Sequence, residues 1–191
     1  MGSEMCIRDR YSGPSSNYYN DLWKFNPTTT EWTWVSGSSA PNGTASYGVQ
    51  GVAADTNVPG ARRDCASWVD SNGIFWMFGG DVGTSSGFND LWKYNPTTNQ
   101  WTWMTGSNST NASGVYGTQG TPAGTNTPGA RYYSMTWIDL SGNLWLFGGA
   151  LSGATYNDLW KFNTTTNQWT WVNGSNTSSP FAVLERKVLQ L

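Results

Sequence analysis

The hydrophobic residues of this chain come in short bursts, separated by stretches rich in glycine, asparagine, serine and threonine. In the burst IFWMF at 74–78 both alternating faces are apolar, and in LWKY at 91–94 Leu91 and Trp92 point to opposite faces. Bursts of this length with two apolar faces are typical of β-strands in a sheet that is covered on both sides. Proline and asparagine between the bursts disfavour helices, so the pattern predicts an all-β chain.

The bursts belong to an internal repeat, and a fixed repeat period is the sequence signature of repeat architectures. The block NDLWKFNPTTTEWTW at 20–34 returns as NDLWKYNPTTNQWTW at 89–103 and as NDLWKFNTTTNQWTW at 157–171. Between these blocks, PGAR and then FGG occur within 59–80, and both recur within 128–149. The first two blocks are 69 residues apart, so the chain consists of copies of one structural unit.

Each complete unit carries four strand signals. In the last unit we expect strands at 131–138 and 143–147, joined by the tight turn DLSG, and then strands at LWKFN and WTWV. A four-stranded antiparallel sheet that repeats along the chain with both faces buried predicts the stacked blades of a β-propeller. The WTW tryptophans are accordingly expected to pack in the blades rather than to form a sugar-binding platform. They are Trp32, Trp34, Trp101, Trp103, Trp169 and Trp171.

The order of these signals, FGG followed by NDLW and then WTW, resembles the kelch repeat of kelch-type β-propellers and of the central domain of galactose oxidase. The resemblance covers roughly residues 17–173 and implies a radial propeller with four-stranded blades. Kelch repeats run to about 50 residues, and the excess length here lies mainly in 36–61 and 105–130. The copper centre that the resemblance implies for galactose oxidase needs histidine ligands. The chain has no histidine, so we expect no copper, no other metal and no cofactor.

Closed propellers need about four to eight blades, so we expect an incomplete propeller of about 2.5 blades, a fragment of a larger protein. The uncovered faces of its outer blades predict self-association. Residues 1–10, MGSEMCIRDR, share no pattern with the repeats and resemble a translated sequencing-library adapter, which predicts a non-native tail. The expected division of the remainder is a half blade with strands three and four (17–35), a long inter-blade loop (36–61), a blade (62–104), a second long loop (105–130), a second blade (131–173) and an off-pattern tail (174–191).

Composition narrows the possible functions. With 10 Lys and Arg against 12 Asp and Glu, the chain has no basic footprint for nucleic acid or an anionic membrane surface. It has no apolar run of about 18 residues, so membrane insertion is not expected. Without histidine, every Ser-His-Asp or Cys-His system is excluded, and we expect this fragment not to be an enzyme.

The long loops supply the candidate binding residues. In an antiparallel meander the tight turns lie on one rim of the propeller and the long loops on the other, which makes the long-loop rim the expected binding face. Both loops contain Tyr-Gly-x-Gln-Gly and Thr-Asn-x-Pro-Gly-Ala-Arg. Such residues either contact a ligand or hold a long loop against its blade. The candidates are Arg62, Arg131, Tyr47, Tyr116, Gln50, Gln119, Asn57 and Asn126.

The two arginines have two possible roles. At the start of the innermost strand they can point toward the central channel and clamp a carboxylate. The alternative is an ion pair inside the repeat, with Asp90 or Asp158. These aspartates, and Asp21 in the first copy, are expected to cap a loop through its backbone.

The hypothesis that best fits these observations is a non-catalytic binding scaffold from a larger extracellular or cell-surface protein, which recognises a protein or a glycan through the long-loop rim. Few lysines and many asparagines, threonines and tryptophans favour an extracellular location. One alternative is a fragment of a propeller hydrolase, lyase or oxidase whose catalytic residues lie outside this chain. The other is a purely structural spacer without a ligand pocket.

Overall fold

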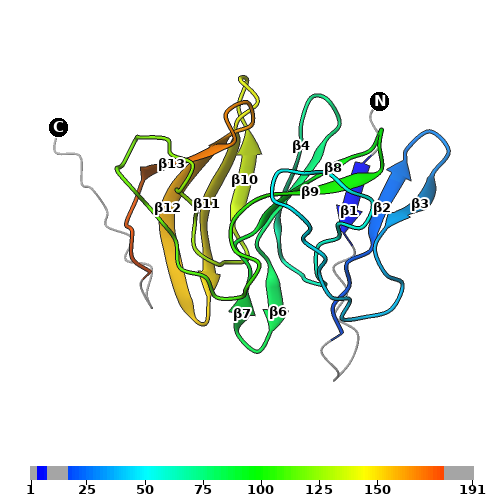
Figure 1. Ribbon diagram of the computed structural model, residues 1–191, viewed down its shortest axis with the longest axis horizontal. Coiled ribbons are helices and arrows are strands. Elements are labelled where there is room, and N and C mark those ends of the chain that lie inside the picture. Colours follow the sequence, from blue (N-terminus) through cyan, green and yellow to red (C-terminus); the bar gives the residue numbers. More distant parts are fainter. Residues whose placement is uncertain (1–3, 8–16, 179–191) are drawn as a thin grey trace, which may run out of the picture.

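The computed structural model describes residues 4–7, as a backbone strand, and residues 17–178. These residues form β-strands and no helix, in three antiparallel sheets of three or four strands, which stand side by side and follow one another along the chain, and one small two-stranded sheet (Figure 1). No helix long and apolar enough to cross a membrane therefore occurs within the described residues. The all-β fold class predicted from the repeat is confirmed.

The three sheets are named in chain order. The first sheet contains β1 (Glu4–Ile7), β2 (Leu22–Asn26) and β3 (Glu31–Ser36). The second contains β4 (Ala66–Val69), β5 (Phe75–Phe78), β8 (Leu91–Asn95) and β9 (Gln100–Thr105), with the small hairpin β6 (Asp81–Gly83) and β7 (Ser86–Gly87) beside it. The third contains β10 (Met135–Ile138), β11 (Leu144–Leu151), β12 (Ala154–Asn163) and β13 (Gln168–Asn173).

Several strands differ from expectation, and in the third sheet β11 continues to Leu151 and β12 already starts at Ala154. The first strand of the third sheet starts at Met135 instead of 131, because Tyr133 has a φ of 60° that interrupts the extended backbone. The first sheet has three strands where two were expected, since Glu4–Ile7 pairs antiparallel with β2. An unpaired strand edge presents free N–H and C=O groups, with which any extended segment can form hydrogen bonds. Residues 4–7 can therefore pair with β2 although their sequence does not match the repeat.

Successive sheets pack face to face. We call the face toward the preceding sheet in the sequence the N-face and the opposite face the C-face. Residues Phe75–Phe78 alternate between the two faces of the second sheet and are all at most 3% exposed, which confirms the predicted burial on both sides. The second C-face and the third N-face share one core cluster, made of Ala66, Trp68, Trp76, Phe78 and Leu91 with Leu144, Leu146, Trp160, Phe162 and Trp169. The first C-face packs on the second N-face through Leu22, Phe75, Met77, Trp92, Tyr94 and Trp101.

Within residues 17–178, no further sheet covers the outermost face at each end of the stack, and these two faces are called uncovered. On the first N-face Trp32 is 56% exposed, whereas Trp101, at the same position of the repeat, is 2% exposed. On the third C-face Phe147 is 39% exposed, whereas Phe78, its repeat equivalent, is 0% exposed. The residue types are the same, so the difference follows from the absence of a neighbouring sheet.

The long loops do not stay on the rim. From the lower rim in Figure 1 each loop climbs along the outer strand of the next sheet. The backbone N–H of Gly51 donates to the Trp103 carbonyl at 2.8 Å, and that of Gly120 donates to the Trp171 carbonyl at 2.8 Å. The loops thereby cover the outer edges of β9 and β13, which would otherwise expose unpaired backbone groups.

Two equivalent buried tryptophans, Trp101 and Trp169, differ in the hydrogen bonding of their indole N–H groups. Trp101 Nε1 donates to Ser36 Oγ at 3.2 Å, whereas the buried Trp169 Nε1 has no hydrogen-bond partner among the described residues. The repeat places Thr105 at the position of Ser36.

Replacing Thr105 with serine is expected to raise the free energy of unfolding by about 1 kcal/mol, because the smaller side chain can orient its hydroxyl toward Trp169. Urea unfolding followed by circular dichroism measures this change. Ser36→Thr, the reverse substitution in the first copy, should lower stability by a similar amount. Equal stability of all three proteins would contradict the explanation.

Candidate functional site

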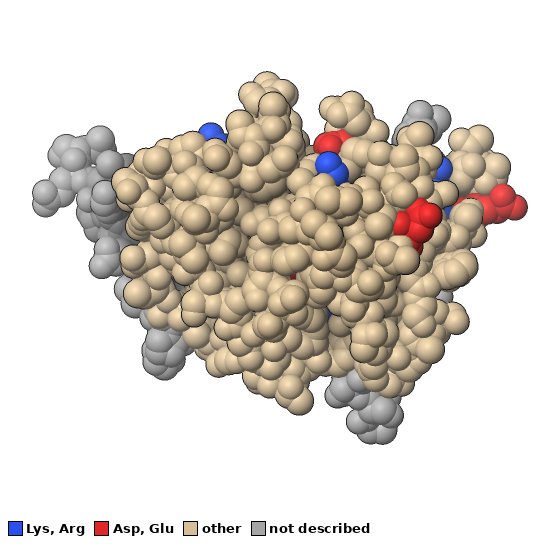
Figure 2. Space-filling view, viewed as in Figure 1, with Lys and Arg blue, Asp and Glu red and all other residues tan. Residues whose placement is uncertain are grey.

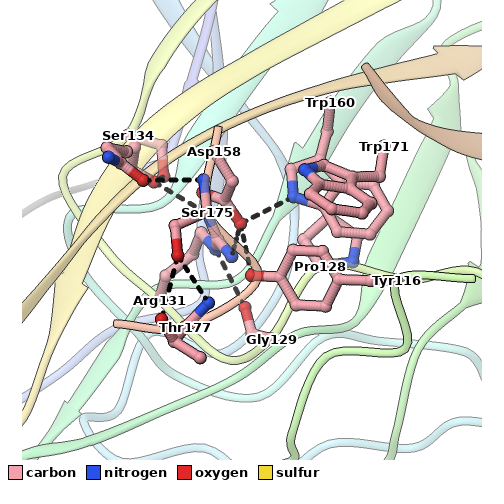
Figure 3. A network of polar contacts seen from close by, with 12 residues as sticks. Tyr116, Pro128, Gly129, Arg131, Ser134, Asp158, Trp160, Trp171, Ser175 and Thr177 are labelled. Atoms are coloured by element: carbon pink, nitrogen blue, oxygen red, sulfur yellow. Dashed lines mark hydrogen bonds and ion pairs between the residues drawn. The ribbon is translucent and has the colours of Figure 1, made fainter. Parts of the chain in front are cut away.

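The repeated arginine and aspartate of each complete unit meet in a buried ion pair. Arg62 Nη1 and Nη2 donate to the two carboxylate oxygens of Asp90 at 2.5 and 2.8 Å, and Arg131 holds Asp158 in the same bidentate way at 2.6 and 2.9 Å (Figure 3). All four residues are at most 1% exposed. The structure thus realises the ion-pair alternative. The guanidinium groups do not face solvent, where a ligand carboxylate would have to meet them.

Backbone carbonyls and an aromatic ring complete the surroundings of each guanidinium. Arg62 Nε donates to the Gly60 carbonyl at 3.0 Å, Nη1 donates to the Gly79 carbonyl at 2.9 Å, and the group lies 4.3 Å from the centroid of the Phe88 ring. Gly79, in FGG, has a φ of 65°, and a Cβ there would lie 2.5 Å from the Arg131 carbonyl oxygen. The PGAR and FGG motifs therefore form one structural unit around the buried arginine.

Each aspartate also binds the preceding long loop. Tyr47 Oη donates to Asp90 Oδ2 at 2.7 Å, and Tyr116 Oη donates to Asp158 Oδ2 at 2.6 Å (Figure 3). Burial and the nearby carboxylates raise the pKa of both tyrosines. Burial alone would raise the pKa of Asp158 as well, but the hydrogen bonds and the charge of Arg131 outweigh it and lower that pKa. At neutral pH the tyrosines are therefore neutral donors and Asp158 is a charged acceptor.

The candidate amides lie along the outer strands. Asn57 Nδ2 donates to the carbonyls of Val52 and Trp101 at 2.9 and 3.0 Å, and Asn126 Nδ2 makes the equivalent bonds in the second loop. Both asparagines are at most 3% exposed. Gln119 is exposed and donates to the Val172 carbonyl at 3.2 Å, and Gln50 is also exposed. These residues secure or flank the part of each loop that covers the outer strand.

A further repeated residue was not among the sequence candidates. The asparagine of NDLW joins the start of one long loop to its end, since Ser107 N donates to Asn89 Oδ1 at 2.9 Å and Asn89 Nδ2 donates to the Pro128 carbonyl at 3.1 Å. Asn20 makes the same two bonds in the first copy. The signal was present in the sequence, because this asparagine precedes the aspartate in all three copies.

The rim opposite the tight turns holds a cleft between the first and second sheets. Its volume is about 690 Å³, and its walls are the loop segment 42–47, the β6–β7 hairpin and residues 108 and 110 of the second loop, with the rings of Tyr18, Tyr47 and Phe88. None of the lining residues is charged. The charged side chains visible in Figure 2 gather in the upper part of the molecule, toward the tight turns. Of the eight sequence candidates, only Tyr47 lines this cleft.

One wall of the cleft is held by an ion pair. Arg63 Nε donates to Asp81 Oδ2 at 2.8 Å, and the Arg63 guanidinium lies 5.3 Å from the centroid of the Tyr18 ring. The ring packs closely on the hairpin, because a Cβ at Gly83 would lie 2.7 Å from the Tyr18 hydroxyl. Among the described residues, no group of three or more acidic, cysteine or histidine side chains is placed to hold a metal ion.

Stacked antiparallel sheets, of which the two four-stranded ones each contain a buried arginine–aspartate pair, define a kelch-type β-propeller segment. The family model of the KLHDC2/KLHL20/DRC7 Kelch-repeats domain matches residues 50–183, and the chain belongs to this Kelch-repeat family. Kelch-repeat domains are generally non-catalytic scaffolds that mediate protein interactions.

A solved structure supports the fold. The structure of YjhT, a kelch-type propeller protein, superposes with a TM-score of 0.51 and 16% sequence identity over 82% of this chain and 46% of the YjhT chain. This chain thus spans about half the length of that propeller protein. The comparison with curated proteins gave no match.

Proposed function

We propose that this chain is a non-catalytic scaffold that binds an uncharged segment of a protein, or an uncharged glycan, in the cleft on its long-loop rim. The single observation that carries this proposal is the lining of the cleft, which combines three aromatic rings with amide and hydroxyl groups and has no charged side chain. The proposed location outside the cell is supported by the composition of the chain, with few lysines and many asparagines and threonines.

The size and chemistry of the cleft fit such a ligand. Binding sites for small ligands usually measure about 300–1,000 Å³ and combine apolar walls with a few polar groups that orient the ligand. Tyr18, Tyr47 and Phe88 provide aromatic side chains, and the exposed residues Asn108 and Thr110 provide hydrogen-bonding groups. An ionic ligand would lose hydration here without gaining an opposite charge, which disfavours acidic glycans and charged peptides.

A second type of interaction surface is present at the two ends of the stack. The uncovered first N-face and third C-face expose tryptophan, phenylalanine and methionine side chains, and monomeric proteins rarely expose large contiguous apolar areas. Self-association through these faces is therefore part of the proposal.

An arginine placed in the cleft tests ligand recognition. After a glycan array and a peptide array have identified a ligand, Thr110→Arg is expected to weaken its binding at least tenfold in isothermal titration calorimetry, because the long charged side chain enters the cleft. Thr97→Arg is the matched control, since Thr97 is an exposed threonine on the opposite rim, in the β8–β9 turn, and it should leave the affinity unchanged. Equal affinity of both variants, or arrays bound only by charged ligands, would contradict the proposal.

A further inference from the structure

We propose that two copies of this chain close head to tail into one ring of six sheets, with the third C-face of each copy packed on the first N-face of the other. The inference rests on the proposed self-association and deepens it by naming which face meets which. Its basis is that the two uncovered faces are the two halves of an interface that the chain already forms internally.

The internal interface between the second and third sheets is the template. There the Phe78 ring meets the Trp169 ring edge to face, with centroids 5.5 Å apart, and Trp76 lies 5.8 Å from Phe162. Phe147 and Trp145 occupy the positions of Phe78 and Trp76 on the third sheet. Both residues lie on the uncovered third C-face. This face therefore carries the same side chains as the second C-face, which packs on the third sheet in the internal interface.

The other half of the template is on the first sheet. The repeat places Trp32 at the position of Trp169, and Phe25 at the position of Phe162. Trp32 is 56% exposed and Phe147 is 39% exposed, and each has an equivalent that is at most 2% exposed inside the stack. Head-to-tail packing would restore both contacts of the template, Phe147 on Trp32 and Trp145 on Phe25.

The packing is directional, which favours this arrangement over the pairing of two like faces. Both internal interfaces join a C-face to an N-face. In the first of them, Leu22 packs with the larger side chains Trp92, Tyr94 and Trp101, so a C-face is complementary to an N-face. Two N-faces would instead bring two exposed Trp32 side chains together, a contact that neither internal interface contains.

The count of sheets fits a closed ring. A head-to-tail contact generates a ring when the rotation closes, and propellers close with about four to eight sheets. Three sheets are too few, whereas two copies supply six. This chain matches 46% of the YjhT chain, so two copies provide about the length of that single propeller chain.

The test is the mass of the 191-residue chain in solution, measured by light scattering after size-exclusion chromatography. We expect a species of twice 20.9 kDa. Trp32→Glu and Phe147→Glu should each give a monomer, because each breaks both contacts of the ring. Leu140→Glu is the matched control, since Leu140 is fully exposed in the turn between β10 and β11, and it should remain a dimer. Unchanged circular dichroism verifies that each variant folds.

Mixing the two broken variants distinguishes the possible arrangements. In an equimolar mixture, the intact C-face of Trp32→Glu can bind the intact N-face of Phe147→Glu, so a two-chain species should reappear with at least tenfold weaker affinity than the unsubstituted chain. A dimer that survives Phe147→Glu but not Trp32→Glu would show pairing of like faces and overturn this inference alone. If the unsubstituted chain were a monomer, the proposed self-association would be wrong as well. The two uncovered faces would then be expected to pack against other sheets of a longer polypeptide.

Discussion

Replacing Asp90 with alanine is expected to lower the free energy of unfolding by about 3–5 kcal/mol, because it removes one partner of a buried ion pair. The Arg62 guanidinium would remain buried without its carboxylate, at 1% exposure. Tyr47 and the indole of Trp92 would lose the oxygen to which both donate. The cost is large because the charge and both donors are removed from water before they lose their acceptor.

Urea unfolding followed by tryptophan fluorescence measures this effect. The control is Asp55→Ala, since Asp55 is exposed and accepts a hydrogen bond from Gln100; its effect should stay within about 0.5 kcal/mol. The double variant Arg62→Met with Asp90→Leu should recover much of the loss, because it leaves no buried charge. A loss below about 1 kcal/mol for Asp90→Ala would contradict the role assigned to this pair.

Phe78→Ala is the second large effect, with an expected loss of about 3–5 kcal/mol. Phe78 is 0% exposed at the interface of the second and third sheets, where its ring contacts that of Trp169. Truncation leaves a cavity between two sheets whose backbones are fixed by their own hydrogen bonds, so the interface cannot collapse to fill it.

Guanidinium unfolding followed by far-UV circular dichroism measures the loss. Leu140→Ala serves as the control, because Leu140 is fully exposed in a turn, and the substitution should be neutral within about 0.5 kcal/mol. If the two substitutions had equal effects, the face-to-face packing of the second and third sheets would be wrong.

The repeated units were readable from the sequence because their signals are dense and periodic. The apolar burst at 75–78 needs two covered faces, and that requirement alone specifies sheets stacked on both sides. The buried WTW tryptophans Trp101 and Trp169 followed from the same argument. Trp32, in the same motif, is exposed in this chain, because burial depends on a neighbouring sheet and not on the motif.

The roles of the repeated loop residues were harder to predict from the sequence. An arginine that the sequence places near the start of an innermost strand is compatible both with a ligand clamp and with a buried ion pair. Which role it has depends on whether the Asp90 carboxylate lies within hydrogen-bond distance, and Asp90 is 28 residues away in the sequence. The course of the long loops was also hidden, because residues 51 and 54 bind the outer strand through their backbones. Backbone hydrogen bonds leave little trace in side-chain patterns.

The cleft was not predicted from the sequence, because several of the residues that line it have no equivalent in the next copy of the repeat. The position equivalent to Tyr18 in the second copy is Gly87, and Asp81, which holds the hairpin wall, has Ala150 as its counterpart. Four segments that are distant in the sequence form the walls. Only the three-dimensional arrangement brings Tyr18, Gly83 and Thr110 to one place.

The measurement that tests the central claim most directly is a map of amide chemical-shift changes, recorded by NMR as an uncharged ligand from the arrays is added to the isotope-labelled chain. The claim that the rim cleft binds while the repeated loop residues are structural predicts changes concentrated in 42–47, in the β6–β7 hairpin and around 108–110. Changes concentrated in the turns of the opposite rim, or along the loop segments that cover β9 and β13, would contradict it.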